Sequence, residues 1–152
     1  VAGHVLSYAG CDLLCYRADA PSELQAHQQA VWQPLLDWAA ETFGAALRVT
    51  DGVIPVEQPA GALTRLRKAV DALDDRSLAA LAVAARASGS LIIGLALIEG
   101  RIDVDAALAA SGLDDRWQND KWGEDPETRK RQDAIREEMQ AAADFLKLVG
   151  GG

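Results

Sequence analysis

The sequence is poor in the residues on which most catalytic and metal sites depend. Its only histidines are His4 and His27, and neither has a second ligand at metal-binding spacing. Its only cysteines, Cys11 and Cys15, stand four positions apart, which fits neither a redox motif nor half of a zinc site. Phosphate-binding glycine loops and nucleophile elbows are also missing. We therefore expect no cofactor and no metal.

Pairs of neighbouring carboxylates are the remaining candidates for acid–base chemistry. They occur at Asp74–Asp75, Asp114–Asp115 and Glu124–Asp125. Each pair stands where a helix is expected to begin, and capping of that helix explains it more simply than catalysis. Nothing else in the sequence points to a cleft that would bring such pairs together. The sequence predicts a protein that is not an enzyme.

Positive charge and long hydrophobic runs are scarce as well. The formal net charge is −8, from 15 Lys and Arg against 23 Asp and Glu. Nucleic-acid binding rests on Lys and Arg, so this balance argues against a nucleic-acid partner. The most apolar segment, residues 78–98, contains Arg86 and several small polar residues, which offset its apolar side chains on a membrane-insertion scale. We predict a buried central helix there and no membrane insertion.

The residues that are present favour packed helices. Hydrophobic residues make up 49% of the 152 positions and aromatics only 5%, so small residues and leucine must fill the core. A helix is expected from Pro21 to Phe43, ending at Gly44, and further helices follow to the end of the chain. Asp51–Gly52 is a turn signal among valines. The predicted fold is mainly α, a compact bundle of five to seven helices with at most a short β-hairpin near residues 47–57.

Two tryptophan-containing segments stand out. The first is residues 32–38, where Trp32 and Trp38 flank Pro34 inside an amphipathic helix. A helical proline costs roughly 3 kcal/mol relative to alanine, so local packing must compensate for it. Either both indoles are core residues, or one of them lies at the surface and anchors a partner. The second alternative is considered because tryptophan is enriched at interfaces.

The second segment is residues 113–127, which carry six acidic residues against Arg116 and Lys121. Trp117 and Trp122 lie five positions apart, or about 140° around a helix, so they cannot share a narrow face. One can pack inward while the other remains available to a partner. A solvated acidic helix with one buried tryptophan remains an equal alternative on physical grounds.

Several ordered motifs resemble one family. They are Asp-Leu-Leu-Cys-Tyr-Arg at 12–17, Trp-x-Pro-Leu-Leu-x-Trp at 32–38, Gly-Val at 52–53 before Gln-Pro at 58–59, Gly-Ser-Leu at 89–91 with Leu-Ala-Leu at 95–97, and the acidic segment through Trp122-Gly123. Together they resemble the ATP synthase assembly chaperones that attend the alpha subunit. Members often have Glu where this chain has Asp114 and Asp115, and Tyr in place of Trp117.

The resemblance implies a domain organisation and a function. Residues 1–18 would connect to an amino-terminal domain absent from this sequence, residues 19–149 would form the helical domain, and residues 150–152 a flexible tail. The protein would hold the unassembled alpha subunit of the catalytic head until beta replaces it. It would act as a monomer, in the bacterial cytoplasm or in the mitochondrial matrix if the source is eukaryotic.

The residues expected to contact this partner lie in the two tryptophan segments. They are Asp114, Asp115, Trp117, Gln118 and Trp122, supported by Trp32 and Trp38. The alternative is a helical adaptor or regulatory domain that binds another protein through the same acidic and aromatic surface.

Overall fold

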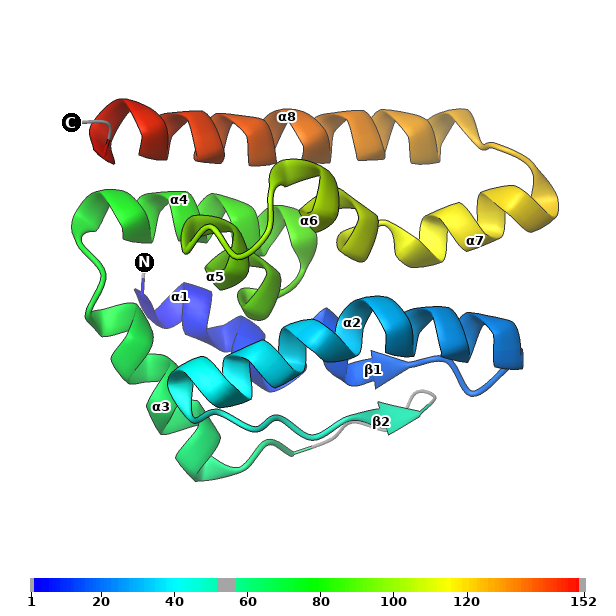
Figure 1. The fold of residues 1–152 in the computed structure, drawn as a ribbon. Coiled ribbons are helices and arrows are strands. Elements are labelled where there is room, and N and C mark those ends of the chain that lie inside the picture. Colours follow the sequence, from blue (N-terminus) through cyan, green and yellow to red (C-terminus); the bar gives the residue numbers. More distant parts are fainter. Residues whose placement is uncertain (1, 52–56, 151–152) are drawn as a thin grey trace.

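The computed structural model describes residues 2–51 and 57–150, and within these ranges the chain is mainly helical (Figure 1). The elements are α1 (Ala2–Leu6), the 3₁₀ helices η1 (Ser7–Cys11) and η2 (Leu13–Cys15), β1 (Tyr16–Arg17), α2 (Ser22–Phe43), β2 (Thr50–Asp51), α3 (Ala60–Asp71), α4 (Asp75–Ser88), α5 (Leu91–Ile98), α6 (Val104–Ser111), α7 (Leu113–Trp122) and α8 (Pro126–Gly150). The prediction of a mainly α fold is confirmed.

The helices form layers around the short, central α5. Helix α8 runs along one side of the molecule, α4 lies beneath it, and α2 runs along the opposite side with β1 and β2 (Figure 1). Helix α4 packs against both α5 and α8, and α5 also contacts α2 and α6. Helix α7 lies at one end, before the turn into α8. This arrangement buries α5 and leaves α7 with neighbours mainly at its start.

Residues 78–98 form two helices where the sequence predicted one. Helix α4 ends at Gly89, which has φ 74° in the left-handed region, and α5 begins at the N-cap Ser90. The Ser90 hydroxyl oxygen accepts a hydrogen bond from the Ile93 amide at 3.0 Å. A glycine C-cap followed directly by a serine N-cap therefore reverses the chain. This break helps to explain why the described residues form eight α-helices and not five to seven.

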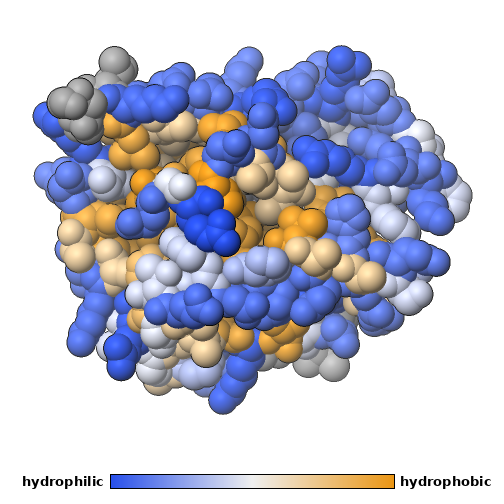
Figure 2. All heavy atoms as spheres, in the orientation of Figure 1, coloured by the Kyte–Doolittle hydropathy of each residue, from blue (hydrophilic) through white to orange (hydrophobic). Residues whose placement is uncertain are grey.

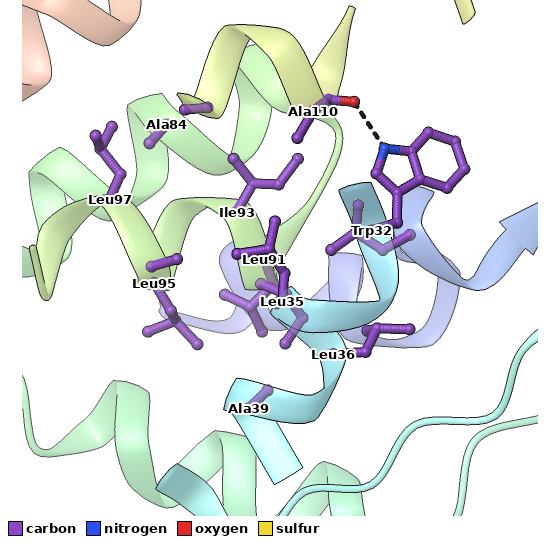
Figure 3. Packing of buried hydrophobic residues seen from close by; sticks show 14 of the residues in the cluster. Trp32, Leu35, Leu36, Ala39, Ala84, Leu91, Ile93, Leu95, Leu97 and Ala110 are labelled. Atoms are coloured by element: carbon purple, nitrogen blue, oxygen red, sulfur yellow. Dashed lines mark hydrogen bonds between the residues drawn. The ribbon is translucent and has the colours of Figure 1, made fainter. Parts of the chain in front are cut away.

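The core lies between α2 and α5. Leu35 and Ala39 lie on the side of α2 that faces α5, whereas Trp32 lies toward Ala110 of α6 and Leu36 points away from α5 (Figure 3). All four side chains belong to the buried core. All residues of α5 from Leu91 to Leu97 are buried, which agrees with the predicted burial of this segment. No helix among the described residues is long and apolar enough to cross a membrane. Hydrophobic burial therefore accounts for the most apolar segment of the chain.

Close packing of α4 on α5 depends on a glycine. A Cβ added at Gly94 would lie 2.9 Å from Cδ1 of Leu81 and 3.3 Å from the backbone nitrogen of Ala85. A Cβ at these distances would force Leu81 and the backbone of α4 to shift, so the present spacing of the two helices relies on the absence of a side chain at Gly94.

A buried carboxylate joins the first part of the chain to the turn between α4 and α5. Asp12 is 0% exposed, and its side chain accepts hydrogen bonds from the Ser90 hydroxyl at 2.6 Å and the Ile92 amide at 3.1 Å. It also accepts one from the Leu14 amide at 3.0 Å. Burial raises the pKa of Asp12, and these donors oppose that effect because they favour the ionised form. The segment before α2 is thus attached to the centre of the bundle.

The two strands form a parallel pair, not a hairpin. Tyr16 pairs with Thr50 and Arg17 with Asp51. The strand at 50–51 therefore pairs with a segment more than thirty positions earlier, and the rest of the predicted hairpin, at 52–56, lies outside the described residues. A turn signal gives no information about such a distant partner, which is why the local prediction was wrong about the pairing.

The expected domain boundaries stay predictions. Val5, Ala9, Leu14 and Cys15, from the expected connecting segment, all belong to the buried core. Of the expected tail, residues 151–152 lie outside the described residues, and Gly150 is the last residue of α8.

Candidate protein-binding site

The first ten residues of the acidic segment form helix α7, which lies between two glycines. Gly112 separates α6 from α7, and a Cβ there would lie 2.8 Å from Oε1 of Gln132 and 3.1 Å from the carbonyl oxygen of Leu108. Gly123 ends the helix with φ 89°, a conformation that strongly favours glycine. Leu113 is buried at the start of α7, whereas the rest of the helix is exposed or half-buried. The two glycines therefore allow tight packing at one end and a sharp exit at the other.

The first carboxylate of the pair contacts α2. The amide nitrogen of Gln28, which is 1% exposed, donates to Oδ1 of Asp114 at 2.8 Å. The amide oxygen of the same glutamine accepts from the Ala18 backbone at 2.8 Å. Gln28 thus connects α7 to α2 and to the segment after β1, although Asp114 itself remains largely exposed.

The second carboxylate contacts α8. Oδ2 of Asp115 accepts from Arg131 at 3.0 Å and from the Gln132 amide at 2.6 Å. The ion pair is partly exposed, with 55% of the Arg131 side chain and 32% of the Asp115 side chain accessible, so it contributes little stability on its own. Neither carboxylate caps the helix, because the N-cap position is Gly112 and makes no side-chain cap bond. The capping explanation is therefore wrong for this pair.

The other two carboxylate pairs do act at helix starts. Asp74 accepts from the Ser77 amide at 2.7 Å, and this bond is the main reason that the pKa of Asp74 lies below its usual value. Asp125 accepts from the Glu127 amide at 3.2 Å at the start of α8. Capping is confirmed for Asp74 and Asp125. Within the part of the chain that the structure describes, no group of three or more His, Cys, Asp or Glu side chains could hold a metal ion.

The two tryptophans of α7 differ in exposure, as their spacing predicts. Trp117 is half-buried against the core, and the ammonium group of Lys121 lies 5.3 Å from the centre of its ring. Trp122 is 82% exposed. An indole this exposed leaves most of its apolar surface in water and gains little from the fold itself.

Gln118 lies beside a hollow between α7 and the start of α2. The hollow has a volume of about 360 Å³ and also contains Arg17 and Asp114 in its wall. The Arg17 guanidinium donates to the Leu14 carbonyl at 2.8 Å and lies 5.7 Å from the centre of the Trp32 ring. Burial lowers the pKa of Arg17. Gln118 is itself exposed and thus accessible from solvent.

The two tryptophans of α2 are placed differently from those of α7. Trp32 is 0% exposed, and its indole nitrogen donates to the carbonyl oxygen of Ala110 at 2.8 Å (Figure 3). It therefore has no surface to offer a partner in this conformation, and it fixes the end of α6, from which α7 begins. Trp38 is half-buried and stacks edge-to-face on Phe43 at 5.3 Å between ring centres.

Sequence reasoning missed the residues that position the acidic pair. Gln28, Arg131 and Gln132 make the contacts described above, yet none was among the predicted site residues. Gln28 offers a signal, since it lies four positions from both Leu24 and Trp32 on the buried face of an amphipathic helix. A glutamine on such a face needs hydrogen-bond partners. No comparable signal marks the two α8 residues.

The chain is similar to proteins of known structure. A family model described as ATP12 chaperone protein matches residues 1–40. Atp12 from Paracoccus denitrificans is 44% identical, with a TM-score of 0.94 over 97% of this chain. An aspartate-to-lysine mutant of that protein is 43% identical with a TM-score of 0.94, and a candidate chaperone from Agrobacterium tumefaciens is 37% identical with a TM-score of 0.89. The chain spans 63% of the length of both Paracoccus chains and 55% of the Agrobacterium chain.

These similarities define the class of protein to which the chain belongs. Nearly the whole chain superposes on a part of proteins described as Atp12 or as a chaperone. Identity of 37–44% over such coverage goes beyond a shared fold. The chain belongs to the ATP12 chaperone family, as the motifs at 12–17 and 32–38 predicted.

Proposed function

We propose that this protein is a chaperone for the assembly of F-type ATP synthase, and that it binds the unassembled alpha subunit of the catalytic head to prevent aggregation until beta replaces it. Membership of the ATP12 family supports a role in assembly without catalysis. The alpha subunit as the partner follows from the family resemblance. A location in the bacterial cytoplasm, or the mitochondrial matrix in a eukaryote, belongs to the same proposal.

The observation that carries the proposed contact surface is the exposure of Trp122. An 82% exposed indole costs solubility and adds nothing evident to the core, so contact with another molecule is its simplest use. Asp120 is also exposed on α7, two positions earlier and therefore on another side of the helix, and it adds negative charge to the exposed surface of α7. Aromatic anchors among acidic groups favour fast, salt-sensitive association, which suits a partner that must later be released.

Asp114 and Asp115 have a second role in this surface. Because they bond to α2 and α8, they hold α7 in place as well as presenting charge to solvent. Reversing either charge would therefore disturb the helix as well as the contact. Trp122 and Asp120 are better positions for separating binding from folding.

The test is light scattering by isolated alpha subunit at low and high salt, with and without the protein. We expect the protein to suppress aggregation and salt to weaken the suppression. Trp122→Ala and Asp120→Lys should each reduce it. Glu41→Lys, an acid-to-lysine change at another exposed position, on α2, is the control and should leave the suppression intact. Circular dichroism should be unchanged in all three variants.

Two results would contradict the proposal. Suppression by both α7 variants at the wild-type level would exclude this surface. If the folded wild-type protein does not suppress aggregation, either the additional part of the chain found in the relatives is required or the partner is wrong. The longer form found in the relatives distinguishes these two explanations. If that form also fails, the partner is wrong, and the alternative of an adaptor for another protein replaces the proposal.

A further inference from the structure

A second candidate surface lies between α8 and the connection from α5 to α6. It is an open hollow of about 700 Å³, room for several leucine-sized side chains. Its apolar wall comes from both sides of the hollow and consists of Leu97, Ile98, Ile102, Val104, Ala143 and Leu146. Figure 2 shows hydrophobic side chains gathered on this face, between the polar side chains of α8 and those of α2. Phe145, directly before Leu146 on α8, is 39% exposed.

The charged side chains around this hollow differ in whether they have bonding partners. Two acids line it, and both are engaged: Asp103 caps α6 through the Ala106 amide at 2.8 Å, and Asp105 pairs with Arg136 at 3.1 Å. Two cations also line it. Neither Arg101 nor Lys147 makes a side-chain hydrogen bond or ion pair with any residue in the described ranges 3–51 and 57–147.

The hollow thus departs from the acidic character of the protein as a whole. The chain carries a net charge of −8, yet at this site Arg136 neutralises Asp105. Arg101 and Lys147 then outnumber the one remaining carboxylate of the lining, Asp103, which keeps its charge while it caps α6. A partner with exposed negative charge would be repelled by most of the surface and attracted here. An apolar wall with free cations at its rim matches an apolar segment that also carries carboxylates.

We propose that this hollow binds an amphipathic helical segment of a partner protein, whose apolar side chains enter the hollow and whose Asp or Glu side chains pair with Arg101 and Lys147. The site is separate from α7. It differs in sign, because α7 offers carboxylates and this hollow offers cations. The proposal holds whether or not the partner is the alpha subunit of ATP synthase.

The test uses two synthetic peptides and measures binding by fluorescence anisotropy. Both carry leucines at every third and fourth position, with glutamates flanking the leucine stripe in one and lysines in the other. The glutamate peptide should bind and shift the methyl NMR signals of Ile98, Ile102 and Leu146. Equal binding of the two peptides, or shifts confined to other methyl groups, would overturn the proposal.

Variants test the role of charge and of the wall separately. Arg101→Glu with Lys147→Glu should weaken binding of the glutamate peptide about tenfold, because two attractive charges at the rim become repulsive. Lys130→Glu, an exposed lysine on the same helix α8 but outside the hollow, is the matched control and should bind normally. Leu146→Ser should weaken the binding of both peptides, because it removes apolar contact with the wall of the hollow. Unchanged affinity in the double variant would refute the proposed pairing.

One further arm decides which molecule occupies the hollow. The longer form found in the relatives should bind the glutamate peptide as tightly as the present chain does. If it does not bind, the additional part of the chain fills the hollow, and the proposal of a separate partner is wrong. This result would leave the alpha-subunit assay and its α7 variants unaffected, so the two proposals fail independently.

Discussion

Replacing Gly94 by alanine should destabilise the protein, although alanine is the better helix former. Within a helix, the change alone would contribute about 1 kcal/mol of stability. Against this, the new methyl group would meet Cδ1 of Leu81 at 2.9 Å and the backbone nitrogen of Ala85 at 3.3 Å. The leucine methyl can rotate away, but the backbone of α4 cannot. The helices must separate, and overpacking of this kind costs about 1–3 kcal/mol.

The same substitution at Gly61 provides the control. Gly61 lies in α3, is exposed, and has nothing within 4 Å of the Cβ position. Gly61→Ala should therefore raise stability by up to about 1 kcal/mol. Gly94→Ala should lower it by up to about 2 kcal/mol, the difference between the cost of overpacking and the gain in helix propensity.

Urea unfolding followed by circular dichroism measures both variants. The midpoints should move in opposite directions with the same dependence on urea concentration, because the surface exposed on unfolding is unchanged. A Gly94→Ala protein that is about 1 kcal/mol more stable than the wild type, like the Gly61→Ala control, would refute the reasoning. It would mean that the contact between α4 and α5 relaxes at no cost.

Two buried groups give further predictions. Asp12→Asn should cost about 1–3 kcal/mol in urea unfolding, because an asparagine nitrogen would face a donor such as the Ile92 amide; an unchanged midpoint would contradict this. Burial raises the pKa of the Cys15 thiol from 9.0 to about 12, so above pH 9 the unfolded chain loses a proton that the folded chain keeps. Stability should then fall by up to about 1.4 kcal/mol per pH unit until about pH 12, and Cys15→Ala should reduce this slope. In the native state a thiol reagent should modify the exposed Cys11 and not Cys15; modification of both would refute the assigned burial.

Helix ends were the best-predicted part of the fold, because their signals are local. Gly44 ends α2 with φ 71°, and Asp103 caps α6, as the sequence indicates. The break at Gly89–Ser90 uses the same kind of signal, but it was overlooked inside a strongly apolar run. The pairing of β1 with β2 carries no local signal, since it depends on how α2 returns the chain.

The candidate site could be predicted only in part for a related reason. Helical spacing shows that Trp117 and Trp122 point in different directions, but not which one faces the core. That choice depends on how α7 meets α8, which is fixed by contacts between distant residues such as Asp115 and Gln132. Trp32 illustrates the same limit, because only the position of α6 decides that its indole is enclosed.

The buried carboxylate of Asp12 also bears on how the chain reaches its fold. Its partner Ser90 is made 78 positions later, so during synthesis the carboxylate stays hydrated until the turn before α5 has left the ribosome. Contacts of such large sequence separation slow folding, because a long loop must close before they form. Residues 12–17 therefore emerge early and acquire their native surroundings late. In the interval the apolar side chains beside Asp12 are unprotected, and folding of this chain would pass through an aggregation-prone stage.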